Sequence, residues 1–252
     1  SQKGYQTKRA YLLKGEKLPP GEFGVMHGYM KIPELKKVCH AYGVSINEYL
    51  VAVYVWSVYT ECMHGMPSER PVRVAVPVNL RPYFNSITTK NLFVMVSAEF
   101  HPTKEIYTFE EVLKSVSESL RSQISRENLE KLFSYNVSNE KLLAARIVPL
   151  FLKNLAMRYV YTTSALANTA TVTNIGNISV SEEYRPYVEM FHAFLAMSKG
   201  QHLKGTICSY GDTLVFSFSY DLTDTSVQRG FFRKIAADGI AVEIETNGVN
   251  YE

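Results

Sequence analysis

The sequence predicts an α/β protein in which helices cover a mixed β-sheet. Apolar residues recur with period two in several short runs, which indicates strands, and with a spacing of three to four in longer runs, which indicates helices. Along the chain, two strands precede a group of helices, and further strands and a last helix follow. This order is typical of a sheet with helices packed against it.

The N-terminal segment differs from the rest of the chain in composition. Residues 1–21 are mostly polar and contain the pair Pro19-Pro20, so we predict an arm or linker there. Residues 22–252 have the apolar content of a folded body, and they are numerous enough to bury a core without disulfides or metals. We therefore predict one body that follows a short arm.

In the first part of that body, residues typical of helix starts and stops show where the elements begin and end. Phe23–Ile32 alternates like a strand, and a helix should run from Pro33 to a stop near Gly43. Ser45–Glu48 forms a capping box, in which serine and glutamate satisfy the first backbone amides of a helix. That helix should reach about Met63, and because it is apolar nearly all round it should be buried on most faces.

The middle and end of the chain divide into further strands and helices. We predict strands at Val72–Val78 and Leu92–Phe100, which flank a turn-rich stretch at Arg81–Lys90. Helices should follow at Phe109–Ser125 and from Asn139 to about Tyr159, the second with a break at Pro149. Four further strands are predicted at Ala170–Asn174, Tyr187–Met197, Leu203–Tyr210 and Thr213–Tyr220. A last helix should run from Asp224 to about Ala237, with Asp224 as its N-cap.

Composition excludes several classes of function. The chain carries 27 Lys and Arg against 24 Asp and Glu, a balance too mild for a nucleic-acid-binding protein. Its three cysteines include no C-x-x-C pair, so neither a zinc site nor a disulfide framework is expected, and free thiols favour the cytoplasm. The longest apolar stretch, Tyr49–Tyr59, is too short to span a membrane.

The residues alone indicate no catalytic centre. The sequence contains no G-x-S-x-G, P-loop or H-E-x-x-H motif, and its six histidines are scattered. His101 and Glu105 have the spacing of a histidine–acid pair, but a solvated surface position is expected beside Pro102. His192 is expected to be a half-buried side chain of a strand. We therefore expect no metal site and no catalytic base within this chain.

Five short sequence motifs nevertheless follow one another between residues 33 and 238. They are Gly43–Leu50, Val76–Pro82, Asn91–Phe93, Val172–Gly176, and the pair Cys208–Asp212 with Phe218–Asp221. Together they resemble the C-terminal lobe of the chloramphenicol acetyltransferase/condensation-domain superfamily of CoA-dependent acyltransferases, and most of all its alcohol acetyltransferase branch. One departure is Lys90, where glycine is commoner.

This resemblance implies a chloramphenicol acetyltransferase-like C-terminal lobe at residues 22–252. Proteins of the superfamily have two similar lobes, and their general base is the second histidine of an H-H-x-x-x-D motif in the N-terminal lobe. This chain has no such motif and begins about where the first lobe would end. The resemblance thus implies an acyl-CoA-dependent O-acyltransferase part that is inactive alone, with acyl-CoA as co-substrate, an alcohol or amine acceptor, and a separate N-terminal lobe as partner.

The same resemblance gives supporting roles to three residues. Arg81 would pair with the aspartate of the histidine motif, and its planar guanidinium suits a partly buried carboxylate. Thr173 and Asn174 would lie near the tunnel, where a hydroxyl or amide could donate to a developing oxyanion. The alternatives are an ordinary solvent-facing turn arginine at position 81 and a simple strand end at Asn174.

Two other functions remain open. The chain could be a non-catalytic module that binds CoA, a pantetheine arm or a protein partner, and an exposed apolar face could then drive homodimerisation. It could also be part of a condensation domain of a peptide assembly line, which would share the fold and the chemistry. No carrier or adenylation segment is visible in the sequence to favour the latter.

Overall fold

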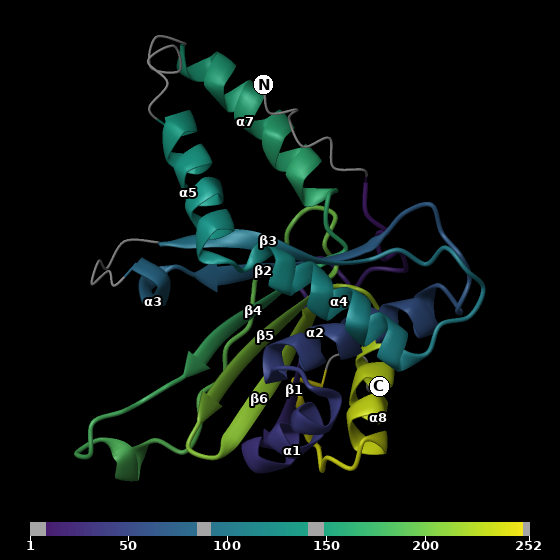
Figure 1. Cartoon of the computed structure of the whole chain (residues 1–252), viewed down its shortest axis with the longest axis vertical. Helices are drawn as coiled ribbons and strands as arrows, with labels where there is room; N and C mark the ends of the chain where they lie inside the picture. The colour runs from purple at the N-terminus through teal and green to yellow at the C-terminus, as the bar shows by residue number, and fades with distance from the viewer. Residues whose placement is uncertain (1–8, 85–91, 141–148, 249–252) are drawn as a thin grey trace.

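The computed structural model describes residues 9–84, 92–140 and 149–248, and Figure 1 shows their arrangement. The strands are β1 (Gly24–Lys31), β2 (Val72–Asn79), β3 (Phe93–Phe100), β4 (Ala170–Asn177), β5 (Leu203–Tyr210), β6 (Thr213–Tyr220) and β7 (Glu243–Thr246). They form one sheet in the order β3-β2-β4-β5-β6-β1-β7. The pairs β2–β4 and β4–β5 are parallel and the others antiparallel, so the predicted mixed sheet is confirmed.

Helix α2 (Ile46–Ser57) lies at the centre of the helical layer. The predicted capping box is present, because the backbone N–H of Glu48 donates to Ser45 Oγ over 3.2 Å and Ser45 N–H donates to the Glu48 carboxylate over 2.7 Å. Every residue from Tyr49 to Val55 is 0% exposed, as the apolar sequence predicts. The helix continues into a π-helical turn at Val58–Cys62.

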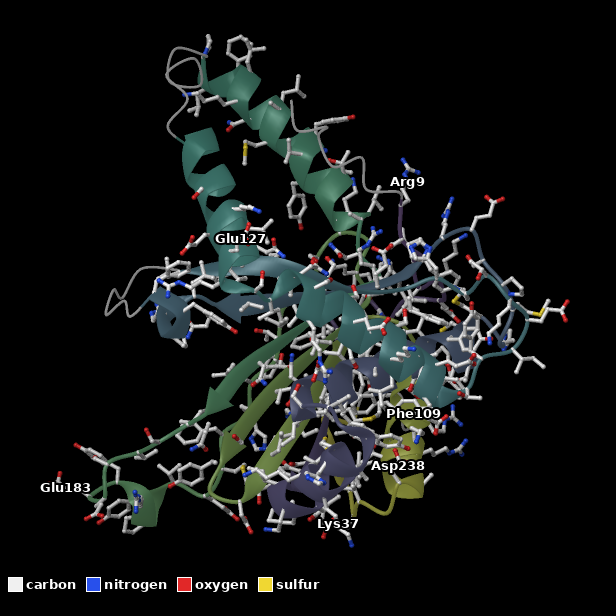
Figure 2. All side chains as sticks on the ribbon, in the orientation of Figure 1. Arg9, Lys37, Phe109, Glu127, Glu183 and Asp238 are labelled. Atoms are coloured by element: carbon white, nitrogen blue, oxygen red, sulfur yellow. The ribbon has the colours of Figure 1, made fainter. Side chains whose placement is uncertain are left out.

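Three helices surround α2 on one face of the sheet: α1 (Ile32–Tyr42), α4 (Phe109–Gln123) and α8 (Ser226–Ala237). Figure 2 shows Phe109 of α4 near Asp238 at the end of α8. Tyr49 Oη donates to Asp238 Oδ2 over 2.7 Å, and the Lys234 ammonium lies 4.0 Å from the centre of the Phe109 ring. Polar and aromatic contacts therefore join α2, α4 and α8 around the Asp238 carboxylate.

Helices α5 (Arg126–Glu140) and α7 (Leu150–Ala165) project away from the sheet in Figure 1. The sequence predicts one interrupted helix from Asn139 to about Tyr159, whereas α5 begins earlier and α7 ends later. Residues 141–148 of that prediction lie outside the described residues. In the described part of the chain, no helix is long and apolar enough to cross a membrane.

Three other predictions need correction. Tyr187–Met197 is not a strand, because its backbone is not paired in a ladder with any described strand of the sheet and it begins in a 3-10 turn, η2 (Arg185–Tyr187). Asp224 is not the N-cap of α8. The cap is Thr225, and Asp224 instead accepts a hydrogen bond from the Ser226 N–H. Strand β7, at the edge of the sheet, was not predicted.

The described part of the predicted arm packs against the body. Leu13 and Leu18 are buried, and the Ala10 and Tyr11 amides donate to the carbonyls of Leu166 and Pro71. The division of the chain between residues 21 and 22 remains a prediction.

Candidate functional site

The parallel strands β2 and β4 separate toward their carboxyl ends, as Figure 1 shows. Their pairing consists of Val74 with Ala170 and Ala75 with Thr171. Beyond these pairs β2 continues beside β3, and β4 beside β5. Pro77 supports the separation because it has no N–H to donate to a ladder. The carboxyl ends of adjacent parallel strands are a common place for ligand sites in α/β proteins, so this divergence is the candidate site.

Arg81 lies on the β2 side of the divergence, at the start of the short helix α3 (Arg81–Phe84). Asn79 Oδ1 accepts a hydrogen bond from the Arg81 backbone N–H over 3.1 Å and a second from its Nη1 over 3.3 Å. The guanidinium is therefore anchored at the strand end and is partly exposed.

Thr173 and Asn174 lie on the β4 side of the same divergence. Asn174 Oδ1 accepts from the Gly176 N–H over 2.8 Å, which leaves the amide nitrogen of Asn174 as the donor of that exposed side chain. Gly176 has φ +87°, and the register with β5 shifts between Asn174 and Gly176. This bulge bends β4 and changes the direction of the Asn174 side chain. Thr173 pairs with Thr206 of β5 and is half-buried.

Residues 189–197, which we call the covering segment, lie against β1, β5 and β6 on the face of the sheet opposite α2. Side chains of the sheet hold its carbonyl oxygens: Cys208 Sγ donates to Phe191 over 3.1 Å, Ser219 Oγ to Leu195 over 2.6 Å, and Lys204 Nζ to Ala196 over 2.8 Å. Burial lowers the pKa of Lys204. The covering segment is thus attached through side chains rather than through a backbone ladder.

A cluster that the sequence did not predict joins the covering segment to β1 and β7. His192 Nε2 lies 2.7 Å from Tyr29 Oη, and the Tyr29 hydroxyl donates to Glu245. The His192 ring lies over the His27 ring with centroids 4.5 Å apart, and His27 Nδ1 is 2.7 Å from Ser217 Oγ. Burial and, after it, the neighbouring His192 lower the pKa of His27, while Glu245 has a weaker effect that raises it.

Beside this cluster lies an open cleft of about 1170 Å³. Its lining includes Tyr29, Tyr187, Glu189, His192 and Glu245. The alternation of His27, Tyr29 and Lys31 in β1 was the only sequence signal for the cluster, and alternation alone does not identify which element covers a strand. In the described part of the chain, no three His, Cys, Asp or Glu residues are grouped as a metal site would require.

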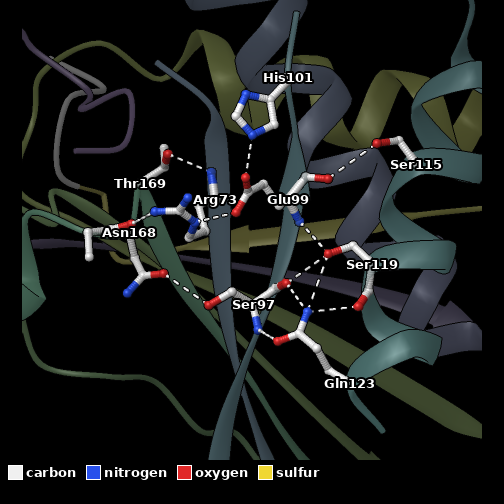
Figure 3. A network of polar contacts seen from close by, with 10 residues as sticks. Arg73, Ser97, Glu99, His101, Ser115, Ser119, Gln123, Asn168 and Thr169 are labelled. Carbon is white, nitrogen blue, oxygen red and sulfur yellow. Dashed lines mark hydrogen bonds and ion pairs between the residues drawn. The ribbon is translucent and has the colours of Figure 1, made fainter. Parts of the chain in front are cut away.

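A second polar network, shown in Figure 3, connects β2, β3 and α4. The buried Arg73 donates through Nε to Glu99 over 2.7 Å and through Nη1 to the Ala167 carbonyl over 2.8 Å. His101 is exposed, as predicted, and contacts Glu99 instead of Glu105. Burial would raise the pKa of Glu99, but hydrogen bonds from Arg73 and His101 lower it below its usual value.

The remaining contacts of this network are structural. Ser119 Oγ of α4 accepts from the Glu99 N–H over 3.2 Å, and Gln123 Nε2 donates to the Ser97 carbonyl over 2.8 Å. These bonds attach α4 to the exposed edge of β3, so the network holds helix and sheet together.

Comparison with known proteins identifies the fold. The sequence matches no family model and no curated protein. Among solved structures, the chain is similar to the wax ester synthase/diacylglycerol acyltransferase from Marinobacter aquaeolei VT8, with 15% identity, a TM-score of 0.54, and coverage of 92% of this chain and 52% of that one. It is also similar to F. sporotrichioides TRI101 complexed with coenzyme A and T-2, with 12% identity, a TM-score of 0.60, and coverage of 92% and 56%.

A third similar structure is the nonribosomal peptide synthetase FmoA3, with 16% identity, a TM-score of 0.60, and coverage of 92% of this chain and 22% of that one. The predicted chloramphenicol acetyltransferase-like mixed α/β fold is therefore confirmed, since these neighbours are members of the condensation-domain and CoA-dependent acyltransferase fold. The chain spans about half the length of the two acyltransferase neighbours.

Proposed function

We propose that this chain is the C-terminal lobe of an acyl-CoA-dependent O-acyltransferase of the alcohol acetyltransferase type. On this proposal the catalytic histidine belongs to another segment, and the chain alone has no transferase activity. The observation that carries the proposal is the divergence of β2 and β4, which places Arg81 at one strand end and Asn174 at the neighbouring one. The shared fold and the half-length coverage of the acyltransferase neighbours support it.

The proposed reaction is a direct transfer. The histidine of the other lobe removes the proton from the acceptor hydroxyl, and the oxygen attacks the thioester carbonyl. The resulting oxyanion then collapses and expels the CoA thiolate, which takes the proton from the histidine and leaves as free CoA. General-base assistance of this kind contributes about 100- to 10,000-fold, which is why the lobe alone should be inactive.

In this reaction the chain contributes support and charge stabilisation. Arg81, which Asn79 holds at the end of β2, braces a carboxylate of the other lobe with its planar guanidinium. Asn174 offers its amide nitrogen to the developing oxyanion because its oxygen is occupied by Gly176. Thr173, the preceding residue of β4, faces the opposite side of the strand and would support the position of Asn174 rather than donate to the same oxyanion.

The substrates follow from the same proposal. TRI101 is recorded with coenzyme A, which supports acyl-CoA as co-substrate, and we propose an alcohol as the preferred acceptor with amines as the alternative. The three free cysteines support a cytoplasmic site of action.

A substrate screen of the full-length gene product tests the reaction class. We expect release of free CoA from short- or long-chain acyl-CoA that depends on an added alcohol and yields the ester. Release that requires a carrier-bound thioester and an amine would assign the chain to a peptide-forming condensation domain instead. Absence of any thioester cleavage with every alcohol and amine tested would refute the transferase proposal.

One observation favours a second function, that of a non-catalytic interaction module. Helix α7 exposes apolar side chains along its length, among them Phe151 at 71%, Leu155 at 67% and Met157 at 65%. Exposed apolar surface of this kind usually marks a place where another protein surface binds. Under this reading the chain would self-associate or bind a partner through α7 without chemistry.

Sedimentation of the isolated chain separates the two functions. A concentration-dependent dimer that the double variant F151S/L155S returns to monomer, combined with an inactive full-length protein, would favour the interaction module. A monomeric chain that associates with a separately expressed upstream lobe would favour the transferase.

A further inference from the structure

Gln228, on the first turn of α8, has a buried side chain whose amide has no hydrogen-bond partner among the described residues. The residue is 1% exposed, yet no group in the described part of the chain hydrogen-bonds its Oε1 or its Nε2. A primary amide carries two donors and an acceptor oxygen, so an unsolvated Gln228 would leave all of them unsatisfied. Such burial is costly, and folded proteins almost always satisfy it with protein or with ordered water.

The side chain borders a small cavity of about 20 Å³. Leu13 and Lys14, from the N-terminal segment, form one wall, and His202, just before β5, and Tyr220 of β6 form others. A cavity must offer about 10–15 Å³ and polar partners to hold one water molecule. The volume meets the first condition, and the buried amide of Gln228, a residue of the lining, supplies polar groups for the second.

We propose that this cavity is a specific binding site for an ordered water molecule, which hydrogen-bonds the amide of Gln228 and links α8 to the neighbouring sheet. The volume of the cavity is sufficient for one water molecule. Because Leu13 also lines the cavity, this water completes the packing of the N-terminal segment on the body. This site is separate from the divergence of β2 and β4, and the proposal is independent of the proposed function.

The variant Gln228→Met gives opposite results for a hydrated and a dry site. Methionine keeps the length of the side chain but removes its hydrogen-bonding groups. If the amide holds a water, the variant loses those bonds, and Tm should fall by about 2–4 °C. If the site is dry, the variant removes unsatisfied groups from the interior, and Tm should rise.

A matched control is Thr206→Val. Thr206 is 2% exposed, and its Oγ1 also has no partner in the described residues, but it does not line this cavity. Valine has nearly the same shape, so Tm of this variant should stay unchanged or rise. A fall in Gln228→Met together with no fall in Thr206→Val supports the water site. A rise in both variants overturns it.

A high-resolution crystal structure of the chain gives the direct readout. We expect a spherical density peak at roughly 2.7–3.2 Å from an amide atom of Gln228, and its loss in Gln228→Met. An empty cavity, or a protein atom at that position, would overturn the proposal even if the thermal shift had the expected sign.

Discussion

The oxygen of the Asn79 side chain holds Arg81 at two points, its backbone N–H at 3.1 Å and its guanidinium Nη1 at 3.3 Å. One asparagine therefore fixes both the start of α3 and the position of the charged group. In the proposed acyltransferase this fixed guanidinium braces a carboxylate of the other lobe. Its planar shape matters for that role as much as its charge does.

Replacing Arg81 by lysine in the full-length gene product should lower kcat/KM by about 10- to 100-fold, because lysine keeps the charge but cannot make a bidentate contact. Steady-state release of CoA measures the effect. Arg185→Lys is a suitable control, since Arg185 is an exposed arginine in η2, and it should leave the rate unchanged. Equal effects of the two substitutions would contradict a bracing role for Arg81.

Asn174→Asp tests the oxyanion donor. The aspartate retains an oxygen that can accept from the Gly176 N–H, so the bulge should persist, but the donor nitrogen is gone. We expect kcat to fall by about 100- to 1,000-fold with an unchanged Tm. Asn177→Asp, at the exposed end of the same strand, is the matched control. A normal kcat in Asn174→Asp would remove this residue from the site.

The ion pair between Glu48 and Arg121 should set part of the acid stability. Burial would raise the pKa of Glu48, but the hydrogen bonds from Arg121 and from the Ser45 N–H outweigh burial and lower the pKa below 4.5. The stabilisation is thus present above that value and is lost as pH falls through the lower folded pKa.

Removing Arg121 should therefore lower the free energy of unfolding and weaken its dependence on pH in acid. We expect Arg121→Ala to reduce the free energy of unfolding by about 1–2 kcal/mol at neutral pH and by less in acid, measured by urea denaturation. Arg126→Ala breaks an exposed pair with Glu130 on α5, and it should cost less than about 0.5 kcal/mol. A pH-independent loss in Arg121→Ala would contradict the assignment.

His27 predicts a second pH dependence, near neutrality. Its pKa in the folded chain is lowered from 6.5, mainly by burial and also by His192, against a smaller opposing effect of Glu245. The unfolded chain consequently binds the proton more readily, so stability is present above 6.5 and is lost as pH falls below it. Ser217 also hydrogen-bonds His27, and Tyr29 hydrogen-bonds His192.

The measurement is the free energy of unfolding between about pH 7.5 and about pH 5.5. The unmodified chain should lose stability over this range, and His27→Gln should lose clearly less. His40→Gln, on the exposed side of α1, should behave like the unmodified chain. Identical pH slopes for all three would show that His27 is not the group responsible.

The sequence predicted those elements in which the spacing of the buried residues matches the backbone hydrogen bonding of the strand or helix. The strands Leu203–Tyr210 and Thr213–Tyr220 and the capping box at Ser45 were predicted with the boundaries that the structure has. In these elements the pattern of burial reflects backbone pairing or helical packing directly, so periodicity suffices to find them.

The covering segment shows why the same reasoning failed elsewhere. Residues 189–197 alternate in burial because an extended segment lies flat on the sheet, but its carbonyls bond to Ser219, Lys204 and Cys208 side chains instead of a strand. Strand β7 was missed for the opposite reason, since its charged, exposed residues are typical of an edge strand and have little apolar signal.

The candidate site was predictable only in part. The motifs around Arg81, Thr173 and Asn174 located two strand ends, but their adjacency depends on the parallel pairing of β2 with β4, which is a non-local contact. The Tyr29–His192 contact joins residues 163 positions apart and had no sequence signal.

The most direct test of the proposed function compares CoA release by this chain alone and by the full-length product of its gene, with the same acyl-CoA and alcohol. A base supplied by another segment predicts that the full-length protein is at least about 100-fold faster, with the isolated chain at the uncatalysed rate. Equal rates for the two proteins, or turnover by the isolated chain, would contradict the claim that the base lies elsewhere.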